Sequence, residues 1–541
     1  MNRIFRCKDI PQKLYCWFKI GMEDRGEILV TYAELGDFAK MQEYLQKSVE
    51  VDLSHLQKAF HIACEKGNVD IVTLLLPERK DLTDPKVPKP LHSVDPSKEN
   101  SYCLRIAEKN GHVPVVLLLV KDGRANSSVD NNYVFRVAAA SGHTEVVRLL
   151  LQDKRVDPTA SENYAIRYAS AYGYADIVPL LLQDKRVYPA AHSSEALRKA
   201  SERGHNTVVL ALLADKRLDP AALDNYAIRK AAEKGHLAVV QSLLADSRVD
   251  PIADKNYALR LACENGHTEV VKALISDPRI DPSIEETICF RKACEKGYVE
   301  IVRCLLADSR LDPKEDYDAG FILSASNGFT EIVSMLLLDP RVDPSASGNA
   351  ACVGACAKGH LEVVRVLLAD TRVDPSDQND LCLRKAANGH VEIVKLLLAD
   401  KRVQPTSANN ESLIIACTGG HLEIATLLLA IPNVDPSVED QEALAQACEN
   451  GHSAIVTLLL THPKTDPIAR TVQIAKEKNH ADIVNSLLMD HRLDPDLRDS
   501  EEFLSKEEVE SRAVKPTVAQ GGKRKRITRK TKRSRKSTRK A

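Results

Sequence analysis

The sequence predicts an all-α solenoid, a helix-turn-helix stack of about fifteen short repeats. Three observations support this prediction. A glycine, usually followed by histidine, returns every 31 residues from Gly111 to Gly359. Apolar residues at helical spacing flank each of these glycines. A proline-containing segment, which cannot continue a helix, separates one repeat from the next. A fixed period of this size is typical of stacked two-helix units that bury their apolar faces against their neighbours.

The period also sets the bounds of the array. Gly36 and Gly67 are again 31 residues apart, and Gly389 follows a one-residue deletion. Asn479-His480 ends the series as a last, degenerate copy. We therefore expect the repeats to occupy residues 24–498, with short loops between them.

Residues 256–286 illustrate the elements expected in one repeat. Asn256 is predicted to cap the first helix, because its side-chain oxygen can accept a hydrogen bond from the first turn. Gly266 should end that helix in the left-handed conformation. The second helix should then run to the prolines of the segment DPRIDPSI. The predicted apolar stripes are Ala258, Leu259, Ala262 and Cys263 on the first helix and Val270, Val271, Leu274 and Ile275 on the second.

These residues resemble ankyrin repeats. The segment AAEKGHLAVVQSLL at 231–244 has the family's alanine pair, Gly-His, and Val-Val and Leu-Leu second helix. The start differs, since tyrosine replaces the family's threonine and arginine replaces its histidine, which only His61 keeps. The unit is also two residues shorter than the family's usual length of about 33. The resemblance implies a protein-binding array with shortened loop fingers, in which the first helices line the concave face.

This 31-residue variant is also similar to ankyrin arrays of giant viruses that infect amoebae and of their protist hosts. That similarity implies host proteins as partners.

Two segments interrupt or precede the array. The proline-rich insertion at 77–97 is either a partner-binding loop or a surface excursion. Residues 1–23 are expected to form an N-terminal cap, with a short recruitment motif as the alternative. After the array, residues 499–512 are expected to form an acidic C-terminal cap and residues 513–541 a disordered basic tail.

The net charge of −1 hides a strong asymmetry. Residues 1–512 contain 62 basic and 76 acidic residues, a net charge of −14. The tail is basic throughout, and three interpretations remain open: a nuclear-import signal, a nucleic-acid phosphate binder, or a segment that binds its own acidic array or an anionic membrane. The candidate tail residues are Lys523, Arg524, Lys525, Arg526, Arg529, Lys530, Lys532 and Arg533.

Cysteine and histidine patterns predict no catalytic, cofactor or metal site. Six of the 13 cysteines fall three residues before a repeat glycine, where other repeats have Ala or Ser, which indicates small core residues. Cys352 and Cys356 are the only close pair on one helix, without a second pair at zinc spacing. The repeated histidines are expected to support the turn between two helices. Without a long apolar segment or a signal peptide, we expect an intracellular, soluble monomer.

Arginines on the first helices are the main candidate for partner binding. They could form a basic stripe for an acidic partner, or pair internally with glutamates four residues later, namely Glu202, Glu233, Glu264 and Glu295. Tyrosines that begin the same helices leave the same alternatives, packing or contact. The candidates are Arg105, Arg136, Arg167, Arg198, Arg229, Arg260, Arg291, Tyr133, Tyr164, Tyr226 and Tyr257.

The sequence thus favours a non-enzymatic protein-interaction scaffold whose tail sets its location. The rival hypothesis is a nucleic-acid-associated nuclear protein bound through its basic tail. An enzyme confined to the insertion or the N-terminus is a remote third, because neither segment is long enough to house one.

Overall fold

The computed structural model describes residues 25–47, 51–76, 94–280, 286–308, 310 and 314–498. The expected N-terminal cap, C-terminal cap and basic tail lie outside these residues, as does most of the insertion. The described chain divides into two compact units. Unit 1 extends to Ser324 and includes Glu331–Val342, and unit 2 comprises Ala325–Thr330 and the residues from Asp343 onward.

The described residues form helices joined by turns, without strands. The helices are α2 (Arg25–Leu35), α3 (Phe38–Lys47), α4 (Leu53–Lys66), α5 (Val69–Leu75), α7 (Lys98–Lys109), α8 (Val113–Asp122), α9 (Val129–Ser141), α10 (Thr144–Gln152), α11 (Ala160–Tyr172), α12 (Ile177–Gln183), α13 (Ala191–Glu202), α14 (Asn206–Leu213), α15 (Ala222–Lys234), α16 (Leu237–Leu244), α17 (Ala253–Glu264), α18 (Thr268–Ile275), α19 (Glu286–Lys296), α20 (Val299–Ala307), α21 (Lys314–Ser326), α22 (Thr330–Leu337), α23 (Ala346–Lys358), α24 (Leu361–Ala369), α25 (Asp377–Ala386), α26 (Val391–Leu398), α27 (Ser407–Thr418), α28 (Leu422–Leu429), α29 (Val438–Glu449), α30 (Ser453–Leu460), α31 (Ala469–Glu477), α32 (Ala481–Met489) and α33 (Pro495–Arg498).

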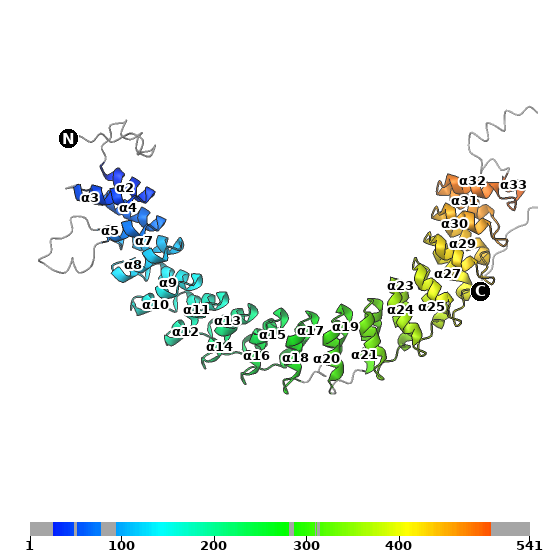
Figure 1. Cartoon of the computed structure of the whole chain (residues 1–541), viewed down its shortest axis with the longest axis horizontal. Helices are drawn as coiled ribbons and strands as arrows, with labels where there is room; N and C mark the ends of the chain where they lie inside the picture. Colours follow the sequence, from blue (N-terminus) through cyan, green and yellow to red (C-terminus); the bar gives the residue numbers. More distant parts are fainter. Residues whose placement is uncertain are drawn as a thin grey trace, which may run out of the picture. The chain divides into compact units, whose positions relative to one another are not determined.

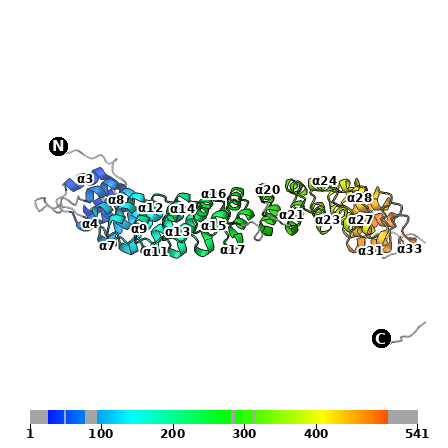
Figure 2. The same cartoon turned by 90° about the horizontal axis from the view of Figure 1, so that it is seen from below.

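Each repeat is an antiparallel pair of helices, and like helices stack on like. In unit 1 the first helices α9, α11, α13, α15 and α17 lie side by side, and the second helices α10, α12, α14 and α16 form a parallel row (Figures 1 and 2). The solenoid fold predicted by the 31-residue period is confirmed.

The core lies between the two rows of helices. In α17 all four predicted residues of the stripe are buried, with exposed fractions of 0 to 2%. In α18 Val270, Val271 and Leu274 are buried, whereas Ile275 is only half-buried because it faces past the core. In α17 three of the four core residues are small and Leu259 is large, whereas the core residues of α18 are all β-branched or larger aliphatic residues. This mixture of sizes allows the repeats to pack closely.

The predicted capping role of Asn256 is wrong. α17 begins at Ala253, and Asn256 lies inside it with a φ of 58°. Asn225, at the same position of the preceding repeat, accepts a hydrogen bond at its Oδ1 atom from the backbone N–H of Asp250 at 2.8 Å. This asparagine position therefore ties the start of a first helix to the loop that follows the repeat.

Three consecutive residues with left-handed backbone angles occur at the start of ten described first helices. For L-residues this conformation costs about 1–2 kcal/mol per residue, so each turn needs compensating contacts. The turns comprise residues 99–101, 130–132, 161–163, 192–194, 223–225, 254–256, 347–349, 378–380, 408–410 and 439–441.

Candidate functional site

The arginines predicted on the first helices, which we call the arginine ladder, fold back on these left-handed turns. Arg105 donates from Nε to the carbonyl oxygen of Asn100 at 3.0 Å and from Nη2 to that of Glu99 at 3.3 Å. Arg136, Arg167 and Arg198 make the same two kinds of hydrogen bond, five and six residues back along the chain. The guanidinium groups thus satisfy carbonyls that the left-handed turn leaves out of the helical pattern.

The same arginines also contact the following repeat. Arg105 forms an ion pair with Asp130 at 2.9 Å. Arg167 forms another with Glu195 at 2.5 Å. Arg136 lies over the ring of Tyr164, 5.3 Å from its centroid. Arg198 over Tyr226 and Arg229 over Tyr257 repeat this arrangement at 5.2 and 5.4 Å. These five arginines therefore link neighbouring repeats. Arg260 instead donates from Nη2 to the carbonyl oxygen of Asp254 at 3.2 Å and lies over the ring of Tyr257 in its own repeat, 4.7 Å from the centroid. The turn before Arg291 lies outside the described residues.

The internal ion pairs expected between arginine and glutamate take another form. Glu202 is bound by Lys199 at 2.9 Å and Glu233 by Lys230 at 2.5 Å. Glu295 is likewise bound by Lys292 at 2.9 Å. Lysine three residues earlier is therefore the partner, because the guanidinium group of the arginine points toward the helix N-terminus.

The predicted tyrosines Tyr133, Tyr164, Tyr226 and Tyr257 are all half-buried. At Tyr164 the structure adds a group that our sequence analysis missed. The rings of Tyr164 and Tyr168 stack with centroids 3.9 Å apart, and Tyr172 and Tyr174 follow at steps of 6.3 and 6.1 Å. We call Tyr164, Tyr168, Tyr172 and Tyr174 the tyrosine column. Its signal was the four-residue spacing of the first three tyrosines, which places them on one helix face.

The tyrosine column reaches the surface at Tyr172. Tyr172 is 49% exposed, and the guanidinium group of Arg203 lies 5.2 Å from its ring centroid. Arg203 is itself fixed, because its Nη1 donates to the carbonyl oxygen of Ala171 at 2.8 Å. Tyr172 is therefore an exposed aromatic ring that the positive charge of Arg203 holds in place.

A second arginine ladder, in the loops, was also missed. Arg248 donates from Nε and Nη2 to the carboxylate of Asp246 at 3.0 and 2.6 Å and from Nη1 to the carbonyl oxygen of Leu218 at 2.9 Å. The Arg248 hydrogen bond holds the pKa of Asp246 below its usual value. We call such an arginine, with the aspartate two residues before it, a loop clamp. Each loop clamp joins a loop to the preceding repeat. Other clamps of this kind are centred on Arg155, Arg186, Arg217, Arg279, Arg310, Arg341, Arg402 and Arg492.

The repeated histidines support turns of the preceding repeat. The ring of His267 contacts the backbone at Gly235, where an added Cβ would lie 2.5 Å from Nδ1. Its Nε2 donates to the carbonyl oxygen of Glu233 at 2.8 Å. The predicted structural role is thus seen across the repeat boundary rather than within one repeat. The same hydrogen bond is made by His112, His205, His236, His360, His390, His452 and His480.

His143 departs from this pattern. Its Nδ1 atom lies 2.7 Å from Oε1 of Glu108, which is 1% exposed. Glu108 occupies the small core position three residues before Gly111, and its Oε2 atom has no hydrogen-bond partner among the described residues. Burial raises the pKa of Glu108, and the nearby His143 opposes that shift only in part.

Three cysteines that our sequence analysis did not connect lie together in unit 2. Cys352 and Cys356 of α23 meet Cys382 of α25, with their Sγ atoms within 4.8 Å of one another. The third thiol was invisible in the spacing because it comes from the next repeat. Among the described residues, this is the group whose donor atoms suit a metal ion.

None of the described helices combines the length and apolarity needed to cross a membrane.

A family model described as ankyrin repeats, in three copies, matches the chain repeatedly. Its overlapping matches cover residues 60–161, 104–191, 135–224, 197–286, 228–319, 290–379, 321–409, 382–471 and 413–499. No curated protein matches the chain.

Proposed function

The chain belongs to the ankyrin-repeat family, and from this premise we propose that it is a non-enzymatic scaffold that binds a protein partner through the exposed side of its first helices. Ankyrin repeats are generally protein–protein interaction modules. The identity of the partner must come from residues that differ between repeats, because the repeated ones serve the stack.

The tyrosine column is the observation that favours this site. Tyrosine and arginine are enriched at the energetic centres of protein interfaces. Tyr172 is exposed, and its ring is already oriented by Tyr168 and Arg203. Binding would therefore order few additional side-chain torsions, which lowers the entropic cost of association.

The first-helix arginines stabilise this surface by packing against its tyrosines. Arg136 lies against Tyr164, whose ring stacks on that of Tyr168. Loss of Arg136 would therefore loosen the column as well as the left-handed turn that it binds. We propose that the arginine ladder, Arg105 to Arg291, acts on a partner chiefly by holding the tyrosines and the helix starts in place.

Proximity labelling in cells with the full-length protein tests the site. Tyr168→Ala combined with Tyr172→Ala should remove the specific partners and weaken binding of each purified partner at least about tenfold. Tyr188→Ala is the matched control, because Tyr188 is 53% exposed but does not belong to the column. Equal partner recovery by the double variant and the control would contradict the proposal.

A second candidate function concerns the tail. We propose that residues 513–541 bind an anionic partner, nucleic acid included, or direct nuclear import, because the sequence places 13 basic and no acidic residues after Arg512. A protein ending at Arg512 should lose its affinity for duplex DNA in a low-salt series, its nuclear retention, or both. If both properties survive truncation, the tail has neither role.

A further inference from the structure

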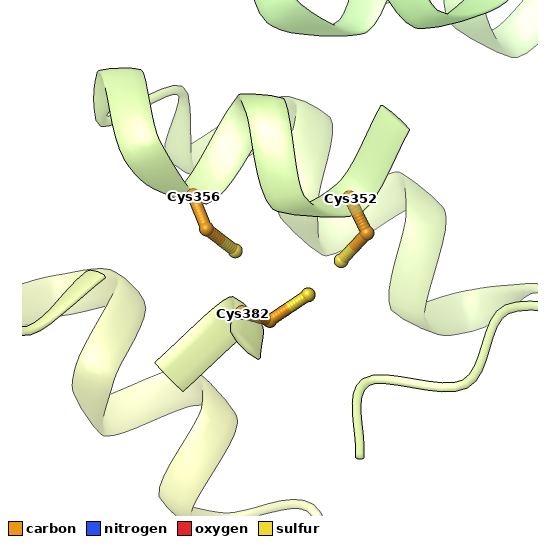
Figure 3. A group of neighbouring side chains, drawn as sticks. All are labelled: Cys352, Cys356 and Cys382. Atoms are coloured by element: carbon orange, nitrogen blue, oxygen red, sulfur yellow. The ribbon is translucent and has the colours of Figure 1, made fainter. Parts of the chain in front are cut away.

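The three cysteines of unit 2 are arranged differently from every other cysteine described. Cys352 and Cys356 lie one helical turn apart on one face of α23, and Cys382 approaches them from α25 (Figure 3). Their three Sγ atoms converge on one point between the helices (Figure 3). Their exposed fractions are 0, 0 and 2%. All three residues belong to unit 2, so no contact between the two units is involved.

The repeat explains two of these cysteines but not the third. Cys356 is at the small core position before Gly359, and Cys382 is at the alanine position that faces it from the next repeat. Cys352 stands where the other first helices place a large apolar residue. The equivalents of Cys352 are Phe60, Leu104, Phe135, Ile166, Leu197, Ile228, Leu259, Phe290, Phe321, Leu383, Leu413 and Leu444. Packing alone favours leucine there, because a smaller side chain loses apolar contact in the core.

Two other cysteine pairs serve as internal comparisons. The Cys64 and Cys103 thiols are hydrogen-bonded to each other at the same two facing positions, as are Cys263 and Cys289. At the third position these sites have Phe60 and Leu259. Facing thiol pairs thus recur as small core residues, whereas the third thiol occurs once among the described repeats.

We propose that Cys352, Cys356 and Cys382 form a three-thiolate site for a single copper(I) ion. Three sulfur atoms about 2.3 Å from a central ion in one plane lie about 4.0 Å apart. The observed separations, all within 4.8 Å, require only a small closure of the side chains. Soft thiolate ligands select copper(I), zinc or iron–sulfur clusters, and binding of the metal releases the thiol protons.

The surroundings favour three ligands rather than four. The carboxylate of Asp380, two residues before Cys382, is committed elsewhere. Its Oδ1 atom accepts the N–H of Gln404 at 2.9 Å, and its Oδ2 atom accepts the hydroxyl of Ser407. Zinc in structural sites is almost always bound by four protein ligands, so a site limited to three sulfurs suits it poorly.

A cation also lies near the site, because the charge of Arg402 acts on Cys352. Arg402 is held in position by Asp400 and by the carbonyl oxygen of Val373. Its positive charge would offset part of the net negative charge of a copper(I) ion with three thiolates.

Copper(I) titration of the reduced full-length protein, against a chelator of known affinity, tests the proposal. The wild type should retain one tightly held ion per chain, with three sulfur neighbours in X-ray absorption and a raised melting temperature. Cys352→Leu should fold normally, because leucine is the usual residue there, and weaken that ion on the order of 100-fold or more, as expected for a direct ligand. Cys263→Ala, at a two-thiol site, should bind copper(I) as the wild type does.

Either of two results would overturn the assignment. One is equal retention of copper(I) by Cys352→Leu and the wild type, which would place the ion at other cysteines. The other is a preference of the wild type for zinc, with a fourth ligand in X-ray absorption, which would exclude a three-coordinate copper(I) site.

Discussion

The turns at Gly235 and Gly111 have the same backbone conformation but different surroundings. Their φ angles are both 76°. Over Gly235 the next repeat places the ring of His267, whereas nothing lies within 4 Å of the Cβ position at Gly111. The difference follows from one residue, because Glu108 binds His143 in a different manner. In these two repeats, the buried acid decides whether the histidine supports the preceding turn.

Alanine substitution of these two glycines should separate the free-energy cost of the left-handed backbone from the cost of displacing the histidine ring. The largest effect is expected at Gly235. Gly235→Ala should cost about 2–3 kcal/mol, the sum of the left-handed penalty and a lost hydrogen bond, because the His267 ring must move. Gly111→Ala should cost only the left-handed penalty, about 1–2 kcal/mol. Hydrogen exchange of the amides around each turn measures both. Equal costs would show that the ring contact contributes nothing.

Removing the buried acid should convert the unusual turn into a regular one. Glu108→Ala places at this position a residue that other repeats have there, and should stabilise the local structure by about 1–2 kcal/mol at pH 8, because a desolvated carboxylate is lost. Slower hydrogen exchange in α7 and α9 would report the gain. A loss of protection would mean that the Glu108–His143 contact stabilises this region more than the burial costs.

The pH dependence of Glu108 should have a definite sign. Its pKa is raised in the folded state, so the folded protein holds this proton more tightly than the unfolded chain does. Its contribution to stability is therefore present at low pH and falls as the pH rises above the ordinary glutamate value of 4.5. The melting temperature of Glu108→Gln minus that of the wild type should therefore increase as the pH is raised above 4.5. A difference that stays constant with pH would refute the prediction.

The loop clamps are common to both regions and should give the smallest effect. Arg124 donates from Nε and Nη2 to the carboxylate of Asp122, both at 2.8 Å, as Arg248 does to that of Asp246. Asp246→Asn and Asp122→Asn should each cost about 0.5–1 kcal/mol at pH 7, because the two arginines remain partly accessible to solvent. The pKa of Asp246 is lowered, so its contribution to stability is complete above the ordinary aspartate value of 3.8 and disappears as the pH falls further. Denaturation of Asp246→Asn and the wild type should therefore converge in acid. Unequal losses of stability in the two variants at pH 7 would show that the contribution of a loop clamp depends on the repeat in which it lies.

Local chemistry was predictable for most of the fold. The glycine positions, the buried stripes of α17 and three of the four stripe residues of α18 could be predicted because they depend on helix periodicity and on the left-handed preference of glycine. Asn256 could not, because the rule for helix caps assumes a chain that enters the helix in an extended conformation. Here three left-handed residues precede the regular part of the helix.

For the candidate site, residue types were predictable and partners were not. The sequence by itself determined the repeating helix pair, the recurrence of Arg105 to Arg291 along one row of helices, and the spacing of Tyr164 and Tyr168. Only the tertiary structure decided that Arg105 binds the carbonyl oxygens of a left-handed turn, that Glu108 diverts His143, and that Cys382 joins Cys352 and Cys356. The physical reason is that the period fixes what each repeat contains, whereas a contact between repeats depends on how the side chains of two neighbours fill the space between them.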